Sequence, residues 1–299
     1  MGFVPFLFEE ALKLGLVPCR FDRNQKQSRS INRLSFLTAN YNPMSNAWDD
    51  WAADYPETML TPWLPGVSNP IFDMIDAFGP HSIETCVDFG CGHGVLVKKL
   101  RHMFPKANVV GLDASQNMLT IARASHPTCR FVWGDMVSLS AWYNQVDLAT
   151  STNSILPATT AEAVQMFREI AATVRHGGIF AGIVPSGDTI EHLIACAREA
   201  KMAAGLTETR ARQEVEAYYV DLHGFDRVSG VYSDDPAGEH PQRIYWPKEI
   251  RILLQRLGFK YIMLEKVAYP WSACQKFGWG YFPWAERCWD WAFCAQKPY

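Results

Sequence analysis

Short apolar runs alternate with amphipathic stretches along the middle of the chain, between about residue 70 and residue 184. Each apolar run predicts a buried strand. Each amphipathic stretch repeats its apolar positions every three or four residues and predicts a helix. Strands that alternate with helices form a parallel sheet with helices on both faces. The elements predicted in this way are Pro70–Phe78 (helix), Thr85–Phe89 (strand), Val95–Phe104 (helix), Asn108–Asp113 (strand), Ser115–Ala124 (helix), strands in the runs Arg130–Met136 and Gln145–Ser154, Ala161–Val174 (helix) and Gly178–Val184 (strand).

The loop between the first predicted strand and its helix is the most informative stretch. Residues 87–96 read Val-Asp-Phe-Gly-Cys-Gly-His-Gly-Val-Leu. Glycine tolerates positive φ and lets a ligand approach the backbone, and the N–H groups of the following helix point at that ligand. A dinucleotide-binding loop would read Gly-x-Gly-x-x-Gly. Here Val95 takes the place of the third glycine, which comes one residue early, and this disfavours a nicotinamide dehydrogenase.

The pattern Asp-x-Gly-x-Gly-x-Gly, which begins at Asp88, resembles the first motif of class I S-adenosylmethionine-dependent methyltransferases. A second apolar run ends at Asp113, 19 residues after Gly94. An acid at about this distance is placed to accept hydrogen bonds from ribose hydroxyls. In the family, the acid that matches Asp113 binds both ribose hydroxyls of the cofactor.

Three further runs resemble later motifs of the same family. Asp135 and Met136 match the pair at the end of the third strand, where the acid binds the adenine amino group and the next N–H binds a ring nitrogen. The run Gln145–Ser154 resembles the fourth strand, whose end lies under the transferred methyl group, and Arg175–Phe180 resembles the entry to the fifth. The resemblance assigns the cofactor S-adenosylmethionine to Asp88, Gly90, Cys91, Gly92, Gly94, Asp113, Ala114, Met118, Asp135, Met136 and Thr152.

The resemblance also implies the fold: a doubly wound α/β sheet of seven strands, mostly parallel with an antiparallel last strand. Near the C-terminal end, Pro247 and Gly258 bracket a helix. The runs Lys260–Val267 and Trp289–Ala295 then resemble the family's antiparallel closing pair.

Each acid also has an ordinary structural interpretation. Asp88 and Asp113 are both common helix-capping residues, and Asp135 could simply end a strand. Their joint occurrence at one edge of a predicted sheet favours the cofactor site, because ligands of open α/β sheets lie at the carboxyl ends of the strands. His93 is interpreted as a variable position of the loop and not as a catalytic residue.

Four segments are distinguished along the chain. Residues 1–43 are predicted to be a poorly ordered extension, with translation beginning at Met44 as one hypothesis and a targeting peptide as the disfavoured alternative. Residues 44–185 and 246–299 are predicted to form the cofactor-binding core. Residues 186–245 lie where the family inserts a substrate lid.

The residues that would contact the methyl acceptor are less well defined. A base is needed only if the acceptor holds a proton of high pKa, and His223, His240 or Asp226 could serve, although a histidine in a lid is more often structural. Asn153 and Tyr245 are candidates for substrate binding. Trp271 and the aromatic residues after it could wall a pocket or could equally be core packing.

Composition limits the function class. The net charge is −3 and the pI is about 6.2, so the chain has no electrostatic footprint for nucleic acid. No stretch approaches the roughly 20 apolar residues of a membrane span. Eight cysteines without a Cys-x-x-Cys pair favour free thiols in a reducing cytoplasm and disfavour zinc.

We therefore predict an S-adenosylmethionine-dependent methyltransferase that acts at N or O of a small aromatic or amine-bearing metabolite. The motif Asn/Asp-Pro-Pro-Tyr is absent after the fourth predicted strand, which disfavours DNA and protein-glutamine substrates. The alternative is a non-catalytic cofactor-binding scaffold or regulatory protein. Metals are not expected, and the oligomeric state stays open, a homodimer included.

Overall fold

The computed structural model describes residues 48–53, 55, 59–79, 83–233, 241–276 and 279–299. Its helices and strands follow the predicted alternation closely. Their bounds are α4 Ile71–Ala77, β1 Thr85–Phe89, α5 Val95–Met103, β2 Asn108–Asp113, α6 Gln116–Ser125, β3 Arg130–Trp133, η2 Ser140–Trp142, β4 Val146–Thr152, α7 Thr160–Thr173, β5 Val174–Val184, α8 Gly187–Ala203, α9 Glu208–Glu216, η3 Ala217–Leu222, β6 Val231–Tyr232, β7 Gln242–Arg243, α10 Pro247–Arg256, β8 Lys260–Ala268, α11 Trp271–Lys276 and β9 Trp289–Gln296.

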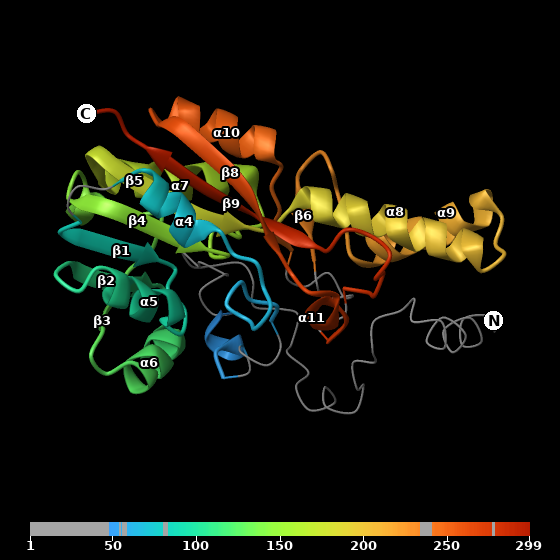
Figure 1. Cartoon of the computed structure of the whole chain (residues 1–299), viewed down its shortest axis with the longest axis horizontal. Coiled ribbons are helices and arrows are strands. Elements are labelled where there is room, and N and C mark those ends of the chain that lie inside the picture. Colours follow the sequence, from blue (N-terminus) through green and yellow to red (C-terminus); the bar gives the residue numbers. More distant parts are fainter. Residues whose placement is uncertain (1–47, 54, 56–58, 80–82, 234–240, 277–278) are drawn as a thin grey trace, which may run out of the picture.

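The main sheet has seven strands in the order β3-β2-β1-β4-β5-β9-β8 (Figure 1). All pairings from β3 to β5 are parallel, whereas β9 runs antiparallel to both β5 and β8. The strand order reverses between β1 and β4, and ligands of doubly wound sheets bind at this switch point, beyond the carboxyl ends of the strands. The predicted fold class is confirmed, including the antiparallel closing pair.

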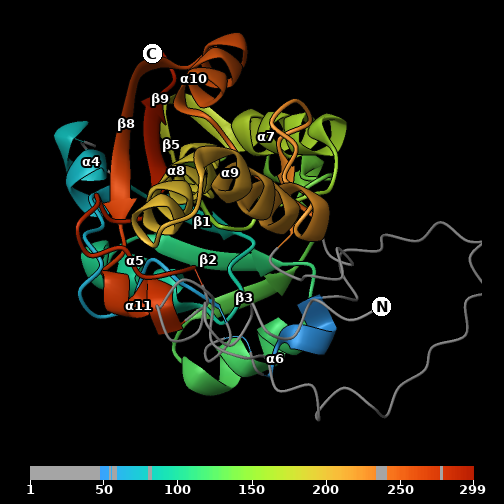
Figure 2. The same ribbon diagram turned by 90° about the vertical axis from the view of Figure 1, so that its right-hand side faces the viewer.

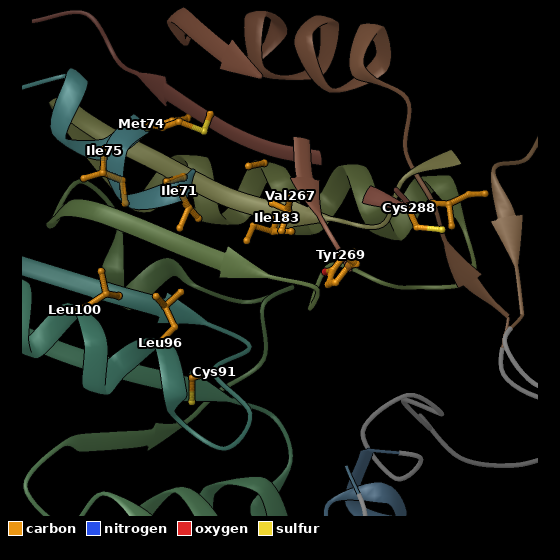
Figure 3. Close-up of a cluster of buried hydrophobic side chains, with 14 of the residues drawn as sticks. Ile71, Met74, Ile75, Cys91, Leu96, Leu100, Ile183, Val267, Tyr269 and Cys288 are labelled. Atoms are coloured by element: carbon orange, nitrogen blue, oxygen red, sulfur yellow. The ribbon is translucent and has the colours of Figure 1, made fainter. Parts of the chain in front are cut away.

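Helices cover both faces of the sheet because strand side chains alternate between them. On one face, Cys86 and Leu148 join a buried cluster with α4, α5 and α6, part of which is shown in Figure 3. On the other face, Val87 and Ala149 pack with α7 and α10. Consecutive residues of both strands are buried, as expected for strands that are covered on two sides.

The segment between β5 and α10 projects from the carboxyl edge of the sheet. It holds α8, α9, the π-helix η3 and the small antiparallel pair β6–β7. Figure 1 shows α8 and α9 beyond the ends of the strands, and Figure 2 shows them in front of the sheet when this edge faces the viewer. This position agrees with a lid over the edge. Among the described helices, none combines the length and the apolar character that a membrane span requires.

The structure departs from the predicted elements mainly at the start of β5 and after residue 270. Strand β5 begins at Val174 instead of Gly178, because Val174 leaves α7 directly and pairs with Val146 in the sheet. The aromatic segment after residue 270 contains a short helix, α11, that has no periodicity long enough to predict. The predicted extension over residues 1–43 lies outside the described residues.

Asp147 links three segments at the amino edge of the sheet. Its Oδ2 accepts hydrogen bonds from the backbone N–H groups of Glu84 and Thr85, each at 2.8 Å. Its Oδ1 pairs with the Arg175 guanidinium. The carboxylate is buried. It supplies the acceptor that the two N–H groups at the start of β1 need.

Replacing Asp147 by alanine is expected to destabilise the protein by about 2 kcal/mol, because two backbone donors lose their acceptor. Urea unfolding monitored by circular dichroism measures this loss. The control is Asp76→Ala, at an exposed position of α4, for which no change beyond about 0.5 kcal/mol is expected. Equal stability of the two variants would contradict the role assigned to Asp147.

Candidate active site

The predicted cofactor residues lie together along the carboxyl edge of neighbouring strands. Asp88 lies in β1 beside the glycine loop, Asp113 ends β2 and Thr152 ends β4. Since β2, β1 and β4 are adjacent and parallel, their ends meet at one edge. Asp135 follows β3 and extends the same row.

The glycine loop has the backbone that its sequence predicts. Gly90, Gly92 and Gly94 have φ values of 72°, 50° and 78°, a region that residues with a Cβ rarely adopt. A Cβ at Gly90 would overlap Ser154, and a Cβ at Gly94 would overlap the ring of Phe131. Within the part of the chain that the structure describes, no atom would lie within 4 Å of a Cβ at Gly92. The space above Gly92 is therefore where a ligand can approach the loop.

Asp113 is held by backbone N–H groups on both of its oxygens. Gly92 donates to Oδ2 at 2.7 Å, and Ser115 donates to Oδ1 at 2.8 Å. Burial raises the pKa of Asp113, while these N–H groups and that of Ala114 lower it, and nearby Asp49 raises it. A carboxylate has about four acceptor positions. The three N–H groups leave the Asp113 carboxylate with acceptor capacity for a further donor, such as a ribose hydroxyl.

Asp88 is buried in β1 and accepts a hydrogen bond from Thr150 Oγ1 at 2.8 Å. Burial raises its pKa from 3.8 to about 7; the Thr150 hydrogen bond acts in the opposite direction, and Asp113 contributes to the increase. A buried acid with a perturbed pKa at the edge of a cleft is a functional-site candidate. A ligand cation nearby would favour its ionised form.

The remaining cofactor candidates support the loop or line its edge. Met118 is buried on α6, and its N–H donates to Ser115 Oγ at 3.1 Å. Met136 reaches the space beside Gly90, and the buried Cys91 thiol donates to the Gly92 carbonyl at 3.8 Å. Asp135 Oδ1 accepts from the Val137 N–H at 3.1 Å, and Ala114 accepts at its carbonyl from the Trp133 indole at 3.0 Å.

An N-terminal segment, residues 48–55 without residue 54, lies against the site. Asp49 Oδ1 accepts from Ser115 Oγ at 2.5 Å and from the Asn117 N–H at 3.1 Å. His93 Nε2 lies 2.8 Å from the Ala52 carbonyl, so this nitrogen carries the proton. The contact gives His93 a structural role, in agreement with its interpretation as a non-catalytic loop position. Sequence reasoning assigned no such role to Asp49.

Tyr55 is the last residue of this N-terminal segment. Its ring lies edge-on to His93, with 5.5 Å between the ring centroids. Burial raises the pKa of Tyr55 to about 12, and the carboxylates of Asp113 and Asp290 contribute to the increase. Tyr55 therefore lies within electrostatic reach of both carboxylates.

A second polar cluster, composed of Asn153, Tyr269 and Asp290, lies at the carboxyl edge of the sheet, where β4 and β8 end and β9 begins. Asp290 Oδ2 accepts from Tyr269 Oη at 2.6 Å and from Asn153 Nδ2 at 2.8 Å. Burial raises the pKa of Asp290 to about 6, against the lowering effect of these two donors and of the Ser186 N–H. Sequence reasoning found Asn153 and missed the other two. The signal for Asp290 was an acid inside an apolar strand run, the same signal that marks Asp88.

The other acceptor-side candidates are placed mainly in packed surroundings. Tyr245 is buried, and its hydroxyl donates to the Ile155 carbonyl at 2.7 Å. Trp271 is also buried, and its indole donates to Ala285 at 3.3 Å. His223 is buried in the insertion, with Nδ1 2.7 Å from the Ser233 carbonyl and its ring stacked on Tyr232. His240 lies outside the described residues.

The described aromatic residues of the segment after residue 270 lie partly in the core and partly at the surface. Trp271 packs edge-on against the buried Phe282, with 5.7 Å between ring centroids, and Trp289 is buried beside Trp291. Tyr281 and Trp284 are exposed.

A cavity of about 750 Å³ lies away from this edge. It is lined by residues at the end of α4, on α10 and at the start of β8. Because β8 runs parallel to β5, its start belongs to the opposite, amino edge of the sheet. The cavity is therefore separate from the candidate active site. Among the described residues, no group of three or more His, Cys, Asp or Glu could hold a metal ion.

Comparison with known proteins agrees with this geometry. Residues 86–178 match the family model described as a methyltransferase domain. The chain thus contains a class I methyltransferase domain, and the cofactor of this domain is S-adenosylmethionine.

Curated relatives include trans-aconitate 2-methyltransferases. The protein of Deinococcus radiodurans is 35% identical over 188 residues, which are 62% of this chain and 61% of that protein. The protein of Escherichia fergusonii is 31% identical over 85 residues, 26% of this chain and 34% of that protein. The matches thus span between about a third and three fifths of these relatives.

Solved structures show the same fold at low sequence identity. An S-adenosylmethionine-dependent methyltransferase of Methanosarcina mazei has a TM-score of 0.51 at 15% identity, covering 73% of this chain and 93% of its own. Another from Mesorhizobium loti has a TM-score of 0.51 at 20% identity, covering 76% and 97%.

Replacing Asp88 by asparagine is expected to stabilise the ligand-free protein at pH 8. The folded-state pKa of Asp88, about 7, lies above the ordinary 3.8. The wild type therefore loses stability as pH rises from about 4 to 7, and the variant does not. Asparagine keeps an acceptor for Thr150. We expect a gain on the order of 4 kcal/mol at pH 8 that disappears near pH 4.

Urea unfolding at both pH values measures this gain. Asp76→Asn, on the exposed side of α4, serves as the control for a generic charge effect. A gain that is equal at pH 4 and pH 8 would show that ionisation of Asp88 is not its cause.

Proposed function

We propose that this protein transfers a methyl group from S-adenosylmethionine to a small molecule. The observation that carries the proposal is the pair Asp113 and Gly92. The Asp113 carboxylate is fixed by two N–H groups and still has acceptor positions to offer, and the space above Gly92 is open. The methyltransferase domain over residues 86–178 supports the same conclusion.

The described residues fit the cofactor chemically. Asp113 would accept the ribose hydroxyls, and Asp135 with the Met136 N–H would bind adenine. Asp88 is buried, and a cation would stabilise its ionised form, so it suits the charged methionine end of the cofactor. The loop passes so close to Ser154 at Gly90, and to Phe131 at Gly94, that neither position has room for a side chain.

Bound S-adenosylmethionine would supply a methyl group that its sulfonium already activates. The protein then has to align the acceptor with that methyl group and exclude water. Positioning of this kind contributes roughly 7–11 kcal/mol to lowering a barrier. The end of β4, at Thr152 and Asn153, is the part of the edge that would lie under the methyl group, and the insertion at residues 186–245 would cover it.

We further propose that the acceptor is a small carboxylic acid, methylated on oxygen. The named relatives act on trans-aconitate, a carboxylic acid. We therefore propose an acid in place of the aromatic or amine-bearing acceptor that the sequence led us to expect. A carboxylate is ionised at neutral pH and attacks without losing a proton. Such a reaction does not require His223 or His240 as a base.

Titration calorimetry with S-adenosylhomocysteine tests the cofactor site. Asp113→Ala should weaken binding by about tenfold to a hundredfold, because two ribose hydroxyls lose a charged acceptor. Asp76→Ala should bind as the wild type does. Equal affinity of wild type and Asp113→Ala would remove Asp113 from the site, and no binding by folded wild-type protein would overturn the proposed cofactor.

Transfer of labelled methyl from S-adenosylmethionine to a panel of small acids, with trans-aconitate among them, tests the activity. Base-labile labelled product would identify methyl esters. Tight binding of S-adenosylhomocysteine without transfer to any acid or amine on the panel would favour the non-catalytic alternative.

A further inference from the structure

The cluster of Asn153, Tyr269 and Asp290 is the part of the edge that the cofactor assignment does not use. Its three members come from the end of β4, from the residue just after β8 and from the second residue of β9. Figure 3 shows Tyr269 just beyond the end of β8. Asp290 and Tyr269 are buried. A buried polar cluster that is assembled from distant parts of the chain calls for a functional or structural explanation.

Asp290 determines which way the Asn153 amide faces. An ionised carboxylate only accepts hydrogen bonds, so the amide must turn Nδ2 toward Asp290 Oδ2, 2.8 Å away. The Tyr269 pKa supports this orientation, because a hydrogen bond from Asn153 lowers it, as a donor to the phenol oxygen would. The amide oxygen, Oδ1, is therefore turned away from the Asp290 carboxylate.

Asn153 Oδ1 is buried and has no hydrogen-bond partner among the described residues. The neighbouring Thr152 Oγ1 is in the same state. A buried acceptor without a donor costs about 1–3 kcal/mol, and such atoms in native structures call for an explanation. Two such atoms on consecutive residues, at the end of the strand beneath the expected methyl position, indicate a ligand that brings a donor.

Asn153 lies next to the cofactor loop. The following residue, Ser154, donates to the Phe89 carbonyl at 2.9 Å and fills the space beside Gly90. Asn153 itself has a φ of 46°, and its N–H donates to the Ile183 carbonyl at 2.8 Å, so the backbone turns sharply there. A group bound at Asn153 would thus lie close to a ligand on the glycine loop.

We propose that Asp290 is a positioning residue that presents Asn153 Oδ1 to a hydroxyl group of the methyl acceptor, so that the acceptor is a hydroxy acid. This inference rests on the proposed function. A hydroxyl satisfies the buried amide oxygen, whereas an ionised carboxylate at the same point would place two acceptors against each other. The cluster therefore selects against acids that carry carboxylates alone, trans-aconitate among them, so the acceptor of this chain would differ from that of the named relatives.

Matched acids test this selectivity. Malate and succinate differ by one hydroxyl, as do citrate and tricarballylate. In methyl transfer, or in protection of the cofactor-loaded protein against thermal unfolding, the wild type should favour the hydroxy acid of a pair at least about fivefold, because a donor fills a buried vacant acceptor. Equal response to both members of each pair would overturn the selectivity.

The role of Asp290 is tested by Asp290→Asn, with Asp76→Asn as the matched control. A neutral amide no longer forces Asn153 to turn its oxygen outward, so the preference for the hydroxy acid should fall below about twofold. Asp76→Asn should keep it. A preference that survives Asp290→Asn would remove the positioning role.

A second measurement is independent of any acceptor. Tyr55, Tyr269 and Cys288 all interact electrostatically with Asp290, and their raised pKa values keep them neutral between pH 5 and 7. The Asn153 side-chain NH₂ signals, assigned by their loss in Asn153→Ala, should therefore shift in ¹⁵N correlation spectra as Asp290 titrates near pH 6. This titration should be absent in Asp290→Asn, where Asp88 still titrates. Signals that do not respond to pH would overturn the Asp290–Asn153 contact.

Cofactor binding separates this inference from the proposed function. If Asn153→Ala weakened S-adenosylhomocysteine binding more than about tenfold, Oδ1 would face the cofactor ammonium and the acceptor role would be overturned. If wild-type protein bound the cofactor but responded to no acid, the acid acceptor would fail and the hydroxy-acid proposal with it. The pH-dependent amide signals would still establish the positioning contact.

Discussion

The hydrogen bonds of Asp113 are the contact on which the cofactor edge depends. One carboxylate oxygen binds the Gly92 N–H and the other binds the Ser115 N–H. The end of β2 is thereby connected both to the glycine loop after β1 and to the start of α6. Ser115 extends this connection to Asp49 of the N-terminal segment. Gly92 has no side chain to fix its left-handed backbone, so this carboxylate holds the loop at Gly92, while the Leu112 carbonyl holds it at Gly90 and Cys91.

Buried acids are the common feature of the two halves of the edge. Asp88 and Asp290 both lie inside apolar strand runs, and burial raises the pKa of each, to about 7 and about 6. A protein retains such groups at a cost in stability, which indicates that they serve the site. Near Asp88 the expected partner is a cation of the cofactor. Near Asp290 the partners are donors of the chain itself, Tyr269 and Asn153, and the effect is to orient an amide.

The fold and the cofactor edge could be predicted because both depend on local sequence. An apolar run of strand length, a glycine at a positive φ and an acid at a strand end can each be recognised from a few neighbouring residues, as in residues 87–96. The acceptor side could not be predicted in this way. Its members are 137 residues apart at their widest hydrogen bond, between Asn153 and Asp290. Trp271 and Tyr245 were plausible candidates by residue type, but only packing decides whether an aromatic ring lines a site or fills a core.

The topology explains why a residue so near the C-terminal end reaches this edge. In a parallel strand the carboxyl end lies at the site, and the next residues continue into a loop or helix. Strand β9 runs the other way, so its first residues lie at the same edge as the last residues of β4 and β5. Asp290 is therefore held in a strand on a rigid sheet and not on a loop, with Val184 paired to its neighbour Trp291. A side chain held in this way can keep the Asn153 amide in one orientation, because Asp290 Oδ2 accepts from its Nδ2 at 2.8 Å. The reversed strand thus brings an acid from near the C-terminal end of the chain to a fixed place at the carboxyl edge of the sheet.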